Sequence, residues 1–175
     1  CVPADVTTTA GLLAAVDRLR AAGPGTVLVT SIDDAAAIAP VPGGSDGAGD
    51  TGEYFGMTES GGGVPGGADP TRTIGMIAVD DSGAYEVRTP RLPLLANGAG
   101  DVTAALFVAH LREAGIEEAL KRTASSIYAV LAETVRRSSA AAGSFGTGSG
   151  VELALIDAQE AIAHPACEFP VTRLR

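Results

Sequence analysis

The stretch Leu94–Gly115, LLANGAGDVTAALFVAHLREAG, decides the fold and carries the main chemical signal of the sequence. It turns from an extended segment into a helix, which we expect from residue 99 to residue 114. Gly115 ends this helix because glycine is the usual residue just past a helix C-terminus. The helical spacing is carried by five apolar residues: Val102, Leu106, Val108, Ala109 and Leu111.

The segment Asn97–Asp101, NGAGD, stands at the start of that helix. Gly98 and Gly100 carry no side chains, so backbone N–H groups can converge on one point there. The first-turn N–H groups have no partner inside the helix, and the helix dipole adds positive charge, so the pattern suits a phosphate. An acidic side chain in such a site makes sense as a base that takes a proton from an attacking hydroxyl. Asp near a helix N-terminus is also common as a plain cap, so the pattern alone leaves both interpretations open.

Upstream, residues 7–22 predict a helix and residues 26–32 a strand, separated by a Gly-Pro-Gly turn. Thr7, Thr8 or Thr9 could cap the helix. Its apolar face consists of Leu12, Leu13, Val16 and Leu19. The strand TVLVTSI is apolar almost throughout, which is typical of a strand covered on both faces. Helix, turn and buried strand together indicate an α/β unit.

Downstream, residues 73–89 predict a β-hairpin around the tight turn DDSG. A second long helix is expected from 116 to 138, a last helix from 151 to 163, and an edge strand in the tail from 167. The stretch 41–70 is rich in Gly and poor in apolar anchors, so we expect a flexible loop or insertion there, or a flap over a ligand.

The composition fits one globular domain of 175 residues, with 46% hydrophobic and 19% charged residues. The net charge of −9 argues against nucleic acid or an anionic membrane as a partner. No apolar run is long enough to span a bilayer, and no signal peptide is visible. Cys1 and Cys167 lack metal-ligand spacing, and His110 and His164 are isolated, so we assign no metal ligand and expect a cytoplasmic protein.

Read together, several segments resemble the ribokinase-like superfamily, and within it the pyridoxal kinases. The resemblance covers most of the chain outside the Gly-rich stretch. It is carried by GPGTVLVTSI (23–32), NGAGDVTAALFVAHL (97–111), EALKRTASSIYAVLAETV (118–135), ELALIDAQEAIAHP (152–165) and FPVTRL (169–174). The last segments are more typical of pyridoxal kinases than of the superfamily at large.

The resemblance implies roles for residues of the NGAGD segment. Asp101 falls on the family's catalytic aspartate, and Gly98, Ala99 and Gly100 fall on its anion hole. The implied reaction is transfer of the γ-phosphoryl group of ATP, with Mg²⁺, to the 5′-hydroxyl of pyridoxal, pyridoxine or pyridoxamine.

Two other segments match positions that bind the nucleotide in the family. Thr30 and Ser31 fall where many members contact the ATP phosphates, although other members have Lys at the first position. The segment that lines adenine and ribose corresponds to Thr89, Pro90, Arg91 and Leu92. The implied fold is a layered α/β fold with a mostly parallel partial sheet between helices, and pyridoxal kinases are usually dimers, which allows a homodimer here.

Family members are considerably longer, and the match implies that their N-terminal, substrate-ring part has no counterpart here. The Asn-x-x-Glu segment that helps to organise Mg²⁺ should follow PADVTT but does not. Three alternatives therefore stand: a pyridoxal kinase or its hydroxymethylpyrimidine-kinase sibling, a non-catalytic nucleotide-binding fragment, or an unrelated interaction protein. Nothing in the charge pattern, nor the 4% aromatic content, favours the last.

Overall fold

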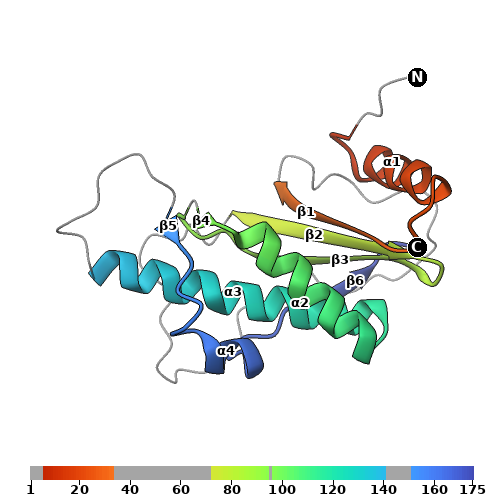
Figure 1. The fold of residues 1–175 in the computed structure, drawn as a ribbon. Helices are drawn as coiled ribbons and strands as arrows, with labels where there is room; N and C mark the ends of the chain where they lie inside the picture. Colours follow the sequence, from red (N-terminus) through yellow and green to blue (C-terminus); the bar gives the residue numbers. More distant parts are fainter. Residues whose placement is uncertain (1–5, 34–71, 95, 141–150) are drawn as a thin grey trace, which may run out of the picture.

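The computed structural model describes residues 6–33, 72–94, 96–140 and 151–175, and the Gly-rich stretch 41–70 lies outside them. Figure 1 shows a sheet with helices on both sides. The elements in chain order are α1 (Thr9–Ala21), β1 (Val27–Asp33), β2 (Thr73–Asp80), β3 (Gly83–Pro90), β4 (Ala96–Asn97), α2 (Ala99–Glu113), α3 (Ile116–Ala140), β5 (Val151–Glu152), α4 (Gln159–Ala163) and β6 (Val171–Arg173).

The main sheet has the strand order β1-β2-β3-β6, and every neighbouring pair in it is antiparallel. The predicted mostly parallel sheet is therefore wrong for these strands and holds only for the two-residue strands β4 and β5. The reason is the length of the connections. Only Asp81 and Ser82 join β2 to β3, whereas a parallel pair needs a crossover of a dozen residues or more. Such a crossover, α2 and α3, separates β4 from β5.

Helices cover the two faces of the sheet through two hydrophobic clusters. On one face α1 packs Leu13 and Val16 against residues of β1, β2 and β3. On the other face α2 and α3 pack Phe107, Ile127 and neighbouring residues against Met76, Ala78, Tyr85 and Val87. The chain thus forms an α/β layered structure, with α4 on the far side of α3 (Figure 1).

Helix α1 begins and ends at the residues that its sequence favours. The Thr8 hydroxyl accepts a hydrogen bond of 3.1 Å from the Gly11 N–H, which is a normal N-cap. Gly23 follows the helix with a φ of 149°, a conformation suited to glycine. One part of the predicted apolar face is wrong, because Leu19 lies one turn beyond Val16 and is 56% exposed.

The apolar sequence of β1 predicts a strand that is covered on both faces. This prediction is wrong, because β1 is the edge strand of the sheet and is only partly covered. Val27, Leu28 and Val29 are half-buried, and Thr30 and Ser31 are exposed. The predicted hairpin is confirmed as β2 and β3, with all eight residues of each strand paired. The predicted edge strand in the tail is confirmed as β6, which pairs with β3.

The predicted helix 151–163 is mostly wrong, since α4 covers only its last five residues. The chain is held on α3 by buried hydroxyl groups instead. Thr134 accepts a 3.0 Å hydrogen bond from the Ala154 N–H, and Ser126 donates one of 2.8 Å to the Ile162 carbonyl. These bonds hold helix α4 and the chain just after β5 against α3, and residues 155–158 between them form turns.

Candidate active site

Helix α2 begins with backbone groups that face open space. Its N-cap is Gly98, which has a φ of 81° and offers no side-chain cap to the first-turn N–H groups. Among the described residues, no heavy atom beyond the chain neighbours and the helix backbone lies within 4 Å of where a side-chain carbon would stand at Gly98 or Gly100. The first-turn N–H groups have no partner inside the helix and lie at the positive end of its dipole, and no described side chain crowds the two glycines, so this helix end suits an anion.

Asp101 is the third residue of α2 and its side chain is exposed. No ion pair or hydrogen bond engages its carboxylate among the residues that the structure describes. The helix itself is firmly placed, because Phe107 is buried against α3 and the Thr103 hydroxyl bonds the Ala99 carbonyl at 2.7 Å. A well-packed helix therefore carries, in its first turn, a carboxylate that makes no hydrogen bond or ion pair with the described residues.

Thr30 and Ser31 lie in a β-bulge near the end of β1. Val29 pairs with Ile77 and Ile32 pairs with Gly75, so three steps on β1 correspond to two on β2. The extra residue is accommodated by Ser31, the only described non-glycine residue with a positive φ, at 60°. This conformation is uncommon for a residue with a side chain and is often found at functional sites.

The bulge has a reason in the packing of α1. Side chains alternate between the faces of a strand, yet Val27, Val29 and Ile32 all pack in the cluster under α1. The bulge changes the alternation, so that Ile32 returns to this cluster while Thr30 and Ser31 stay exposed. Two neighbouring hydroxyl side chains are thereby presented near one end of the sheet.

The predicted adenine and ribose segment lies at the end of β3. Thr89 and Leu92 are buried, at 7% and 8% exposure, and Pro90 and Arg91 are half-buried. The Arg91 side chain forms an ion pair with Asp33, and its backbone N–H donates a 2.9 Å hydrogen bond to the Arg72 carbonyl. The buried side chains place this segment, and only its partly exposed members are available to a ligand.

The structure brings the segments Thr30–Ser31 and Thr89–Leu92 to the same end of the sheet. Strands β1 and β3 both run antiparallel to β2, so both finish at the same end of the sheet, where β2 begins. The residues Asp33 and Thr89 both pair with Ile74 of β2. Helix α2 begins beside β4, toward the same end of the molecule in Figure 1.

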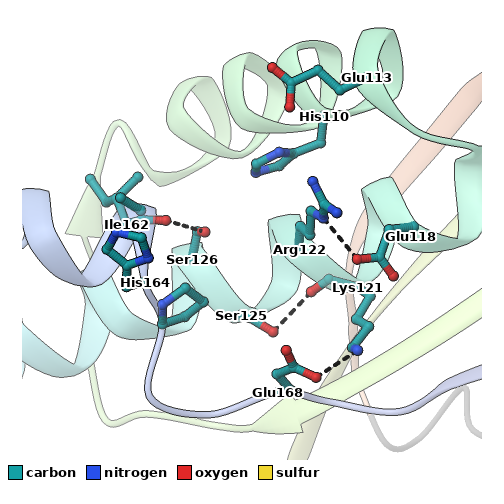
Figure 2. A pocket seen from close by; sticks show the side chains of 12 residues that line it. His110, Glu113, Glu118, Lys121, Arg122, Ser125, Ser126, Ile162, His164 and Glu168 are labelled. Carbon is teal, nitrogen blue, oxygen red and sulfur yellow. Dashed lines mark hydrogen bonds and ion pairs between the residues drawn. The ribbon is translucent and has the colours of Figure 1, made fainter.

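A cleft of about 570 Å³ lies elsewhere, between the end of α2, the first half of α3, and α4 with the residues that follow it (Figure 2). His110, the residue of α2 in its lining that is nearest to Asp101, is nine residues along the helix from it, about 13.5 Å at the helical rise. The cleft is therefore separate from the open helix end.

Four charged groups of this cleft form two ion pairs. Lys121 forms an ion pair of 2.6 Å with Glu168, and Arg122 one of 2.8 Å with Glu118. His110 contributes a buried Nε2 atom without a hydrogen-bond partner. Burial, and next the charge of Arg122, lower the pKa of His110 below its usual value. Both cationic side chains of the cleft are engaged by carboxylates, and Glu113 adds a further negative charge, so the cleft does not favour a phosphate.

Asp33 lies in the candidate site but was not among the site residues that we predicted from the sequence. Its partner Arg91 is 58 residues away, so no local pattern joins the two. The described ranges contain no cluster of three His, Cys, Asp or Glu residues that could hold a metal ion. None of the described helices is long and apolar enough to cross a membrane.

Comparison with known proteins gives one consistent group of relatives. The chain is 39% identical over 163 residues to the pyridoxal kinase PdxY of Leifsonia xyli, which covers 93% of this chain and 42% of that protein. It is 39% identical over 171 residues to the PdxY of Rubrobacter xylanophilus, or 97% of this chain and 44% of the relative. The chain thus spans less than half the length of these curated relatives. No family model matches the sequence.

Solved structures share the fold. Pyridoxal kinase from Leishmania donovani, in complex with ADP and pyridoxine, superposes with a TM-score of 0.65 at 20% identity, over 98% of this chain and 46% of that one. A Bacteroides thetaiotaomicron protein that is described as a phosphomethylpyrimidine kinase superposes with a TM-score of 0.58 at 17% identity, over 98% of this chain and 45% of that one. The chain is thus similar in sequence to pyridoxal kinases over nearly its whole length and shares the fold of solved pyridoxal kinases, and it corresponds to somewhat less than half of such a protein.

Proposed function

We propose that this chain is the nucleotide-binding part of a kinase that transfers the γ-phosphoryl group of ATP to the 5′-hydroxyl of pyridoxal, pyridoxine or pyridoxamine. The observation that carries the proposal is the exposed carboxylate of Asp101 in the first turn of a helix whose N-cap, Gly98, supplies no side-chain cap to the first N–H groups. The helix dipole stabilises an acid at this place, but a carboxylate beside a bound phosphate also repels it, and the role of a general base accounts for an acid there.

Asp101 would act as the general base. Its carboxylate would accept the proton of the alcohol as the alcohol oxygen forms a bond to the γ-phosphorus and the bond to the β–γ bridging oxygen breaks. The first-turn N–H groups of Ala99, Gly100 and Asp101 would donate hydrogen bonds to the transferred phosphoryl oxygens. Gly98 makes this arrangement possible, because its left-handed φ of 81° turns the backbone into the helix.

The strand ends would hold the rest of the nucleotide. Thr30 and Ser31 offer exposed hydroxyl groups to phosphate oxygens, and the segment Thr89–Leu92 would lie against adenine and ribose. Mg²⁺ commonly binds through phosphate oxygens, waters and only one or two carboxylates. The described residues, which lack a three-ligand cluster, fit a metal ion of that kind that is bound mainly by the nucleotide.

A second candidate function is a nucleotide-binding fragment without turnover. It is favoured by the length of the chain, which spans 42% and 44% of its two kinase relatives. Catalysis by positioning fails when nothing positions the alcohol. The sibling activity on a hydroxymethylpyrimidine is favoured only by the shared fold. A homodimer and a cytoplasmic location remain predictions from the sequence.

The test is a coupled ADP-release assay with Mg-ATP and pyridoxal, on the parent chain, Asp101→Asn and Glu117→Gln. Glu117 is a matched control, an exposed acid in the first turn of the neighbouring helix α3. We expect turnover in the parent and the control, and a loss of about 10²-fold or more in Asp101→Asn. ATP binding by calorimetry without turnover in any variant would instead support the nucleotide-binding fragment. Absence of ATP binding would contradict both.

A further inference from the structure

The ion pair between Asp33 and Arg91 joins the ends of two strands that are not neighbours. Asp33 is the last residue of β1, Arg91 follows the last residue of β3, and β2 lies between these strands. A guanidinium N–H of Arg91 donates to the Asp33 carboxylate, and the two side chains are 37% and 56% exposed. The pair therefore crosses the start of β2, at the end of the sheet where both segments that are predicted to bind the nucleotide lie.

One end of this connection is firmly placed. The Arg91 backbone extends the β2–β3 ladder through its 2.9 Å hydrogen bond to Arg72. Thr89 and Leu92, on either side, are buried. Arg91 thus projects from a fixed backbone, and its guanidinium can serve as an anchor for a less constrained partner.

The other end is the bulge of β1. Ser31 holds a left-handed φ of 60°, which a residue with a side chain adopts only when its surroundings impose it. Before the bulge, Val29 pairs with Ile77; beyond it, the described part of the β1–β2 ladder contains Ile32 and Asp33. The ion pair therefore supplies an additional restraint on the short side of the bulge.

The pair also removes an electrostatic conflict. A free carboxylate two residues from Ser31 would repel the phosphate oxygens that this segment is proposed to contact. The adjacent guanidinium offsets that charge, so the acid can hold the bulge without repelling the nucleotide.

We propose that Asp33 is a positioning residue, which acts through Arg91 to fix the Thr30–Ser31 bulge relative to the segment Thr89–Leu92 before ATP binds. This inference rests on the proposed function, because it assigns these segments to the nucleotide. Asp33 does not touch the reacting atoms in this scheme. Its loss should therefore weaken nucleotide binding and raise the KM for ATP, while kcat at saturating ATP stays within about twofold.

The experiment compares Asp33→Asn, which loses the charge, with Asp33→Glu, which can keep the pair. Asp81→Asn is the matched control, since it removes an exposed ion pair with Arg20 near the β2–β3 turn, at the opposite end of the sheet. For each variant, calorimetry gives the Kd for ATP, and amide hydrogen exchange without nucleotide reports on residues 30–33. The exchange readout needs no ligand and no turnover.

For an exposed pair we expect Asp33→Asn to exchange faster at residues 30–33 and to bind ATP about twofold to fivefold more weakly. Asp33→Glu and Asp81→Asn should resemble the parent in both measurements. Parent-like exchange and affinity in Asp33→Asn would overturn the inference, and so would a Glu variant as impaired as the Asn variant. If the parent bound no ATP, the proposed function would fail, and exchange alone would decide whether the pair holds the bulge.

Discussion

Asp33 and Thr89 stand at the same level of the sheet, because each pairs with Ile74, from opposite sides of β2. One belongs to the edge strand with the bulge and the other to the buried strand β3. Since adjacent strands are about 4.8 Å apart, these two positions are separated by roughly 10 Å. The antiparallel arrangement therefore gathers two segments that are far apart in sequence at one edge, next to the end of the molecule where α2 begins.

The first prediction concerns Gly98, whose φ of 81° is costly for any residue with a side chain. Gly98→Ala should lower the free energy of unfolding by roughly 1–2 kcal/mol, measured by urea denaturation. Gly98→Asn should recover part of the loss, because Asn adopts the left-handed region more readily. Equal stability of all three proteins would mean that the N-cap conformation is not required.

The second prediction separates folding from binding at Gly100. This residue lies in the first turn of α2 with a helical backbone, and nothing stands within 4 Å of an added Cβ. Gly100→Ala should leave stability unchanged or raise it by up to about 1 kcal/mol, because Ala is the better helix former. If the phosphate occupies the open space, ATP binding should weaken more than tenfold. A variant with undiminished affinity would place the phosphate elsewhere.

The third prediction concerns the Thr134 hydroxyl, which is buried on α3 and accepts a hydrogen bond from the Ala154 N–H. Thr134→Val keeps the shape but leaves that N–H without its partner, at a cost of about 1–3 kcal/mol. Thr123→Val is the control, because Thr123 is equally buried and its hydroxyl bonds only the Ala119 carbonyl in its own helix. Both are measured by urea unfolding, and similar losses would argue that the bond to Ala154 contributes nothing.

Local signals in the sequence predicted the elements that depend on local chemistry. The helix expected from 99 to 114 is α2, Ala99–Glu113, because apolar spacing and the flanking glycines act within one helix. The cap at Thr8 and the hairpin of β2 and β3 follow in the same way from a threonine and a two-residue turn. Gly98–Asp101 lie at the start of α2, as the pattern predicts, and their role in the site stays a prediction.

Features that depend on distant contacts were not predictable. The segment at Thr30 and Ser31 contains neither Gly nor Pro, and its bulge arises only because Val29 and Ile32 must both pack under α1. The antiparallel order of the sheet follows from connection lengths rather than from the apolar character of β1. The Asp33–Arg91 pair joins residues 58 positions apart, which no periodicity reveals.

The fourth prediction concerns the ion pair between Asp17 on α1 and the C-terminal residue Arg175, which donates a 2.9 Å hydrogen bond to it. This hydrogen bond lowers the pKa of Asp17 in the folded protein. A depressed carboxyl pKa stabilises the fold above the unfolded value, about 3.9, and that stability is lost as the pH falls through the folded value. Asp17→Asn should remove this part of the decline in unfolding free energy at acid pH.

The effect should stay below about 1 kcal/mol, because both side chains are nearly half exposed and the pair is screened by salt. Urea midpoints from pH 6 to pH 2.5 measure it. Arg175→Gln should give the same flattening as Asp17→Asn, and the double variant should add nothing further. Additive effects of the two changes would mean that the residues do not act as a pair.

The last prediction concerns His110, whose pKa is lowered in the folded protein by burial and then by Arg122. A histidine with a folded pKa below its unfolded value of about 6.5 favours the unfolded chain when it takes up a proton. The free energy of unfolding should therefore decline as the pH falls from 7 through the folded pKa. In this range His110 takes up at most one proton when the chain unfolds. His110→Gln should flatten the decline, whereas His164→Gln, which removes the exposed histidine of the same cleft, should leave the contribution of His110 in place. An unchanged slope in His110→Gln would assign the pH dependence to other groups.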